Sequence, residues 1–263
     1  MYHTLEIQRD GALATIWMNR PEVHNAFNAR LIADLYDACR ELDADEAIRV
    51  VILAGRGRSF SAGADVKWMQ AAGQASVEDN RADARRLAAM LRTLAELSKP
   101  TLARVHGPAL GGGLGLAAAC DLCVAATCAV FATSEVRLGL VPATISPYVI
   151  RAIGERQAYR YFLTAERIDA VRARDLGLAH EVVAPEHLDA RIASLAQELL
   201  RGGPEALAAS KDLIRAVAHR PIDDAVVEES ARRIAAQRAT PQAKEGLAAF
   251  LDKRPPAWSA GGF

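Results

Sequence analysis

Stretches of continuous apolar residues alternate with stretches of helical periodicity through the first two thirds of the chain. Residues 49–54, 101–106 and 122–126 have the length and composition of buried strands. Between the first two, residues 79–97 carry the apolar spacing of an amphipathic helix. Buried strands connected through helices predict an α/β architecture with largely parallel strands.

The two ends of the chain add a hairpin and a helical region. Polar and apolar residues alternate over 4–9 and 13–18, on either side of Asp10-Gly11, which is typical of a β-hairpin. Asn28 is placed to cap the helix that follows. After about Asp169 the pattern becomes helical, apart from one candidate strand at 179–183.

No linker, repeat or low-complexity segment divides the chain. The amphipathic segments near the carboxyl end favour an appendage that packs on the core or on a neighbouring subunit; they cover 190–200, 205–218, 222–237 and 241–253. We therefore divide the chain into a core of residues 1–195 and a helical region of residues 196–263.

The segment RVHGPALGGGLGLAAAC, from Arg104 to Cys120, carries five glycines where a helix or a strand would normally avoid them. Close helix packing explains one or two of them. A dinucleotide-binding loop is an alternative, since Gly113 to Ala118 fits G-x-G-x-x-A, but the preceding strand ends too early for that loop. The third interpretation is an anion hole, in which backbone N–H groups at the start of a helix hold an oxygen that gains negative charge.

A second loop of small residues, SFSAGADVKWM from Ser59 to Met69, follows the strand at 49–54. It is not a nucleophile elbow of the G-x-S-x-G kind, because Ser59 takes the place of the first glycine. Two such loops, each after a buried strand, favour a site in which backbone groups rather than side chains bind the ligand.

Charge and hydropathy exclude several classes of partner. Thirty-two basic residues balance thirty-two acidic ones, so no overall charge favours nucleic acid. The longest uncharged runs are too short to span a bilayer, and the amino end lacks the pattern of a signal or transit peptide. We therefore predict a cytoplasmic protein with neither a nucleic acid nor a membrane as partner.

The cysteines and histidines do not form a metal-binding pattern. Cys120 and Cys123 form a C-x-x-C pair, with Cys128 nearby, but no second pair or histidine pair accompanies them. Buried thiols that act as small apolar residues are the favoured interpretation. His106, at the end of a predicted buried strand, is expected to satisfy a hydrogen bond in the core.

The two small-residue loops, taken together, resemble those of a known family. The pairing of S-A-G-A-D-V-K-W-M (61–69) with V-H-G-P-A-L-G-G-G (105–113), followed by F-x-x-S-E-V-R-L-G-L-V-P (131–142), resembles the enoyl-CoA hydratase/isomerase, or crotonase, family. The resemblance extends from Asn19 to Trp258 and implies a crotonase-like α/β fold, a superhelix of repeated β-β-α units with a helical C-terminal region. Residues 134–150 are similar to the branch that hydrates 3-methylglutaconyl-CoA and related acyl-CoAs.

This resemblance implies roles for individual residues. The backbone N–H groups of Ala64 and Gly112 would hold the thioester oxygen while its negative charge grows. Trp68 and Met69 would begin the acyl pocket, and Lys253 is similar to a phosphate-contacting lysine that a neighbouring subunit often contributes. The residues implied in substrate binding are Ala62, Ala64, Asp65, Val66, Lys67, Trp68, Gly112 and Lys253.

The glutamates decide which chemistry the resemblance implies. Hydratases of the family typically use two, and Glu135 matches the second position, whereas the first falls on Gly115. Another group, or a carboxylate of the substrate itself, would then activate water. Alternatively the enzyme is an isomerase, in which one carboxylate carries a proton between C4 and C2, or the chain binds acyl-CoA without turnover.

From these observations we predict an enoyl-CoA hydratase that acts on a branched or carboxylated acyl-CoA, with isomerase as the alternative. The catalytic residues implied are Glu135, Ala64 and Gly112. We expect no cofactor besides the CoA that the substrate carries, and no metal. The helical region 196–263 is expected to join subunits into a homotrimer or a dimer of trimers.

Overall fold

The computed structural model describes residues 2–259. Its main sheet has six strands in the order β1-β2-β3-β4-β6-β9. β1 pairs antiparallel with β2, and the other neighbours in this sheet pair in parallel, which confirms the predicted architecture. The strands are β1 (Leu5–Asp10), β2 (Leu13–Met18), β3 (Val50–Gly55), β4 (Thr101–Val105), β6 (Leu122–Ala126) and β9 (Glu181–Val183).

The predicted hairpin is confirmed, with Leu5 opposite Met18 and a turn at Gly11, whose φ of +54° favours glycine. β3 is buried at every position. Alternate residues of β3 enter different clusters, because successive side chains of a strand point to opposite faces. Val51 and Leu53 join one buried cluster, and Val50 and Ile52 join the other.

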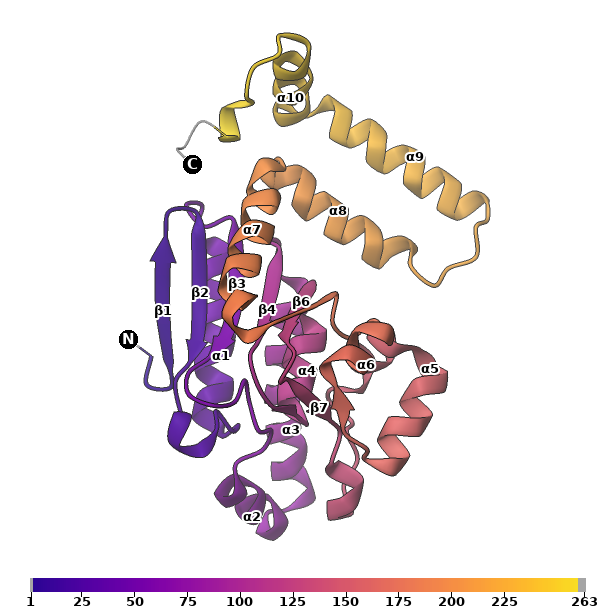
Figure 1. Ribbon diagram of the computed structural model, residues 1–263. Helices are drawn as coiled ribbons and strands as arrows, with labels where there is room; N and C mark the ends of the chain where they lie inside the picture. Colours follow the sequence, from indigo (N-terminus) through magenta and orange to yellow (C-terminus); the bar gives the residue numbers. More distant parts are fainter. Residues whose placement is uncertain (1, 260–263) are drawn as a thin grey trace.

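Helices cover both faces of the main sheet (Figure 1). α1 (Ala29–Ala44) and α3 (Val77–Glu96) pack on each other and on the face of Val51 and Leu53. The side chain of Asn28 accepts a hydrogen bond from the N–H of Leu31 at 2.8 Å, which confirms the predicted cap of α1. α7 (Leu188–Arg201) covers the opposite face.

A smaller sheet has the strand order β5-β7-β8, and it supplies the second strand of each repeated β-β-α unit. Its strands are β5 (Ala109–Leu110), β7 (Val130–Ala132) and β8 (Ile168–Asp169). β4, β5 and α4 (Gly112–Ala119) form one unit, and β6, β7 and α5 (Ser146–Thr164) form the next. Each unit starts in the main sheet and passes through the small sheet, so α4 begins directly after β5.

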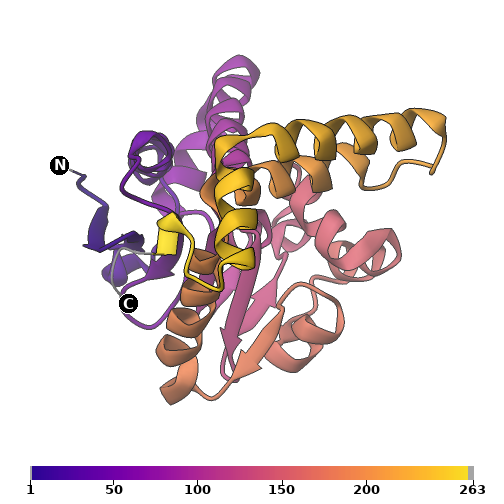
Figure 2. The ribbon, with the colours of Figure 1, turned by 90° about the horizontal axis from the view of Figure 1, so that it is seen from above.

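Three helices, α8 (Pro204–Val217), α9 (Asp224–Ala239) and α10 (Pro241–Leu251), extend from the body as an arm (Figures 1 and 2). Lys211 anchors α8: its Nζ donates to Oδ2 of Asp121 at 2.6 Å and to the carbonyl of Lys99 at 2.9 Å. The arm exposes large apolar side chains, among them Ile222 and Phe250. The division predicted between residues 195 and 196 falls inside α7, and that division stays a prediction.

Two sequence interpretations differ from the structure. No helix is predicted over α5, which contains Gly154 with a φ of +75° that interrupts its pattern. The short α6 (Ala170–Asp175) begins where the pattern is predicted to become helical. Cys120 and Cys123 are buried as predicted, but Cys128 is exposed, so the prediction of a buried thiol is wrong there. Cys128 lies in the tight turn between β6 and β7, where side chains face outward. Within residues 2–259 no helix has the length and hydropathy to cross a membrane.

Candidate active site

The loop after β3 and the loop after β4 lie side by side. Ser61 forms a parallel bridge with Ala109, through backbone hydrogen bonds of 3.1 and 2.9 Å to the residues that flank Ala109. Beyond the bridge Gly63 and Gly111 meet, because a Cβ placed on Gly111 would lie 3.8 Å from the Cα of Gly63. The residues that follow these two glycines are the predicted N–H donors.

The N–H of Ala64 is left available by a second bridge. Phe27 pairs with Ala64 in parallel: the N–H of Phe27 donates to the carbonyl of Gly63 at 2.6 Å, and the N–H of Asp65 donates to the carbonyl of Phe27 at 2.8 Å. A bridge of this kind uses the groups on either side of Ala64, so the N–H of Ala64 itself points away from Phe27. It can therefore donate to a ligand.

The N–H of Gly112 stands at the start of α4. Gly111 precedes the helix with a φ of +48°, and its own N–H donates to the carbonyl of Ala132 at 2.8 Å. Gly112 is the first helical residue, so its N–H has no partner within the helix. It lies at the positive end of the helix dipole, which favours a negatively charged oxygen.

Neighbouring side chains take up the space that the glycines of α4 leave. A Cβ on Gly112 would lie 2.7 Å from Cε2 of Phe27, and a Cβ on Gly111 would lie 3.1 Å from Oε1 of Glu135. A Cβ on Gly115 would overlap the side chain of Ile145, whose own Cβ would be 2.8 Å away. Close contacts with three different segments, together with the positive φ of Gly111, therefore account for these glycines, and no dinucleotide is needed to explain them.

Glu135 is the ionisable group at this site. It begins a short 3-10 helix, Glu135–Leu138, after β7, and its carboxyl group lies against Gly111. Oε2 is buried and has no hydrogen-bond partner within residues 2–259. Burial raises the pKa of Glu135 above its ordinary value of 4.5, although its own backbone N–H opposes the shift. The structure thus brings Ala64, Gly112 and Glu135 together.

The implied CoA segment leads into α2 (Val66–Gln74). Asp65 caps this helix, since its Oδ1 accepts the N–H of Lys67 at 2.9 Å, and it pairs with Arg20 at 2.9 Å. The hydrogen bond from Arg20 holds the pKa of Asp65 below its ordinary value. Val66 and Lys67 are exposed, and Trp68 is half-buried against the core. The side chain of Asp65 therefore positions the loop.

A hollow of about 360 Å³ adjoins this loop. Lys67 is exposed at its rim, while the other two basic side chains of the hollow have carboxylate partners: Arg20 pairs with Asp65 and Arg30 with Asp34. The hollow is lined by Arg20, Asn28, Ala29, Arg30, Asp65, Lys67 and Trp68.

Sequence reasoning assigned no role to Asn25, which holds the loop after β3 in place. Asn25 is fully buried with a φ of +54°, and its Nδ2 donates to the carbonyls of Arg56 and Ser59, both at 2.9 Å. Its backbone carbonyl accepts the hydroxyl of Ser61 at 2.8 Å. Asn25 lies in N-R-P-E-V-H-N-A-F (19–27), the stretch with which the family resemblance begins, and this stretch is the feature of the sequence that points to it.

Lys253 is not brought to this site within one chain. It follows α10, which lies at the opposite end of the molecule from α2 (Figure 1). His106 follows the last residue of β4 and is half-buried, so the prediction of a hydrogen bond in the core is wrong: its Nε2 contacts the carbonyl of Gly57 at 2.9 Å outside the core, and its Nδ1 has no hydrogen-bond partner within residues 2–259. Among residues 2–259, no three His, Cys, Asp or Glu side chains gather closely enough to hold a metal ion.

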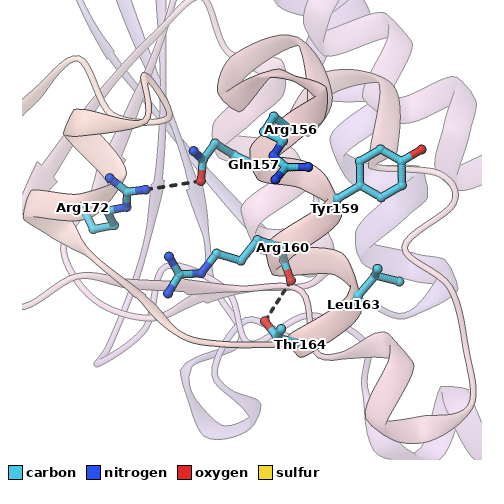
Figure 3. Close-up of a pocket in the computed structure, with 7 residues that line it drawn as sticks. All are labelled: Arg156, Gln157, Tyr159, Arg160, Leu163, Thr164 and Arg172. Carbon is cyan, nitrogen blue, oxygen red and sulfur yellow. Dashed lines mark hydrogen bonds between the residues drawn. The ribbon is translucent and has the colours of Figure 1, made fainter.

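A second hollow, of about 460 Å³, lies on the outer side of α5 and α6 (Figure 3). Arg172 donates to Oε1 of Gln157 at 3.2 Å across it, and Arg160 pairs with Glu166 at 2.7 Å. None of its lining residues belongs to the donor loops or to the segment of Glu135. This hollow is separate from the candidate active site.

Comparison with known proteins matches the sequence and the fold of this chain to one family. A profile described as "Enoyl-CoA hydratase/isomerase" matches residues 8–261. A crystal structure of an enoyl-CoA hydratase from Shewanella pealeana is 38% identical, with a TM-score of 0.95 over 97% of this chain and 96% of that one. Crotonyl-CoA hydratase of Syntrophomonas wolfei is 33% identical over 96% of both chains. The 4-chlorobenzoyl coenzyme A dehalogenase-2 of Arthrobacter sp. is 29% identical over 95% of this chain and 91% of its own.

Proposed function

This chain belongs to the enoyl-CoA hydratase/isomerase family, and on that basis we propose that it is a hydratase that adds water across the 2,3 double bond of an acyl-CoA thioester. One observation carries the proposal. The available N–H groups of Ala64 and Gly112 belong to the residues that follow Gly63 and Gly111, which meet, and the carboxyl group of Glu135 lies against Gly111. Oε2 of Glu135 is buried with no hydrogen-bond partner within residues 2–259.

In the proposed reaction, the N–H groups of Ala64 and Gly112 hold the thioester oxygen and stabilise the charge that it gains. The oxygen of water bonds to C3, and C2 takes a proton from the carboxyl group of Glu135. The proton that water loses returns to the same carboxyl group, so Glu135 ends unchanged. Burial supports this role, because a raised pKa keeps more of the carboxyl protonated near neutral pH.

Isomerisation is the second candidate, and Gly115 is the observation that favours it. Position 115 carries no side chain, and Ile145 occupies the space beside it, so a second carboxylate is absent from that position. A single carboxylate suffices to move a proton from C4 to C2 of a 3-enoyl thioester. A protein that binds acyl-CoA without turnover is the third candidate.

The proposed substrate is a branched or carboxylated acyl-CoA of the 3-methylglutaconyl kind. Its CoA part, an anion, would lie along residues 62–67 and reach the hollow beside Lys67. Lys253 of a neighbouring subunit would contact a phosphate, with the exposed apolar faces of the arm joining the subunits into a trimer or a dimer of trimers. A cytoplasmic setting belongs to the same proposal.

The test offers purified protein a 2-enoyl-CoA and a 3-enoyl-CoA and follows the absorbance of the conjugated thioester. A hydratase removes that absorbance from the 2-enoyl substrate, whereas an isomerase creates it from the 3-enoyl substrate. A binder does neither and still binds CoA. Repeating the assay with 2-enoyl-CoAs that carry a 3-methyl group or a distal carboxylate ranks the acyl groups.

A further inference from the structure

Gly115 and Ile145 fit together in the first part of α4, one turn beyond Gly111, the residue that Glu135 contacts. The N–H of Gly115 donates to the carbonyl of Gly111 at 3.0 Å, so these glycines stand one helical turn apart, about 5.4 Å along the axis. The carboxyl group of Glu135 lies against Gly111, and the side chain of Ile145 lies against Gly115. Glu135 and Ile145 thus lie against residues that are one turn apart at the start of α4.

Ile145 is held in that position by its surroundings. It is 2% exposed and belongs to the main buried cluster, and it precedes the first turn of α5, where its carbonyl accepts the N–H of Val149 at 3.1 Å. The overlap that any Cβ at position 115 would make with Ile145 shows that the two residues are matched. The branched side chain at position 145 fits only because position 115 has no side chain.

We propose that Ile145 is a specificity-determining residue that selects acyl groups with an alkyl branch at C3. The inference rests on the proposed function, in which the thioester oxygen lies at Gly112 and C2 lies at Glu135. An acyl chain that runs along α4 from Gly112 toward Gly115 then presents its C3 substituent to Ile145. An alkyl substituent packs there, whereas a polar one would lose its hydrogen bonds to water without replacement.

The matched contact is tested first, by melting, without any ligand. Alanine favours helix over glycine, so Gly115→Ala would raise the melting temperature if position 115 were open. We expect it to lower the melting temperature, and Ile145→Ala to relieve that loss in the double variant. Ile153→Ala, the same truncation at a buried position of α5, serves as the control and should give no relief. A Gly115→Ala protein as stable as the parent would overturn the proposed contact.

Selectivity is tested by binding, so that it does not depend on turnover. Dissociation constants for 3-methylbutanoyl-CoA and butanoyl-CoA are measured by calorimetry for the parent, Ile145→Ala and the milder Ile145→Val. We expect the parent to prefer the branched ligand, and Ile145→Ala to reduce this preference about tenfold, since one methyl group in an apolar pocket is worth about that much. Ile145→Val should give a smaller loss, and Ile153→Ala should leave the preference within twofold.

The two proposals fail in different ways. If the parent turns over neither 2-enoyl nor 3-enoyl thioesters but the preference for the branched ligand depends on Ile145, the proposed reaction is wrong and the selectivity stands. If the parent is a hydratase but Ile145→Ala and Ile153→Ala change the preference equally, Ile145 acts only through general packing and the selectivity inference is overturned. Absence of any acyl-CoA binding rejects both.

Discussion

Replacing Glu135 by glutamine should separate what this residue does for catalysis from what it does to stability. Glutamine keeps the size of the side chain and removes the exchangeable carboxyl proton. A positioned acid or base contributes roughly a hundredfold to ten-thousandfold, so turnover should fall by at least a hundredfold, or about 2.7 kcal/mol of activation free energy. Binding of CoA should persist, because the N–H donors are on Ala64 and Gly112.

The same substitution should stabilise the fold at alkaline pH. Burial raises the pKa of Glu135 in the folded protein, so the folded state binds its proton more tightly than the unfolded chain. From the ordinary value of 4.5 up to the raised folded-state value, the free energy of unfolding therefore falls as pH rises. Above that pH window the carboxylate is ionised and the whole loss in free energy of unfolding is present. Below the window the carboxyl group is protonated and the loss is absent.

The size of this effect follows from the ionised form of the carboxyl group, because Oε2 is buried and has no hydrogen-bond partner within residues 2–259. A buried polar group without a partner costs about 1–3 kcal/mol, and the amide of glutamine would keep part of that cost. A net gain of about 1 kcal/mol corresponds to about 2–4 °C in melting temperature for a chain of this size. We expect this gain at pH 8.5 and little of it at pH 5.

The assays are calorimetric melting at both pH values and absorbance-based turnover of the preferred enoyl-CoA. Glu155→Gln, an exposed glutamate of α5, is the matched control and should change neither quantity. A Glu135→Gln protein that keeps turnover within tenfold of the parent would show that Glu135 is not the proton carrier. An equal change in melting temperature at pH 5 and pH 8.5 would refute the argument from its buried carboxylate.

Three further predictions concern the hole, the arm and its anchor. Gly112→Pro removes an N–H at the first helical position, where proline is tolerated, and should lower turnover by about a hundredfold or more relative to Gly112→Ala. Gly112→Ala is the control because it adds the same Cβ against Phe27 but keeps the N–H donor. Equal turnover of the two variants, with matching circular-dichroism spectra, would exclude this donor. Ending the chain before Pro241 removes α10 and should weaken both subunit association, measured by light scattering, and CoA affinity. A shortened protein unchanged in both would show that the segment from Pro241 onward contributes only local packing. Lys211→Met leaves Asp121 without its buried cation and should lower the free energy of unfolding by about 3 kcal/mol in a denaturant titration, whereas loss of an exposed pair would cost under about 1 kcal/mol.

The amino-acid sequence by itself determined the features that depend on neighbouring residues. The hairpin at Gly11, the cap at Asn28 and the buried strand β3 follow from turn residues, capping preference and apolar pattern, each of which acts within a few residues. α5 was not predicted, because prediction relies on the local pattern and Gly154 interrupts that pattern. The placement of α5 depends on packing against α4. The residues of the candidate site were also identified from the sequence, through the motifs that carry the family resemblance.

The tertiary structure alone decided how those residues meet. The bridge between Ser61 and Ala109 joins segments 48 positions apart and brings Gly63 against Gly111. Likewise, the sequence shows that position 115 has glycine instead of glutamate. Only the packing of α5 on α4 shows that the side chain of Ile145 fills the space beside Gly115. Backbone conformation is largely a local choice, whereas close contact between distant segments depends on the excluded volume of the whole folded chain.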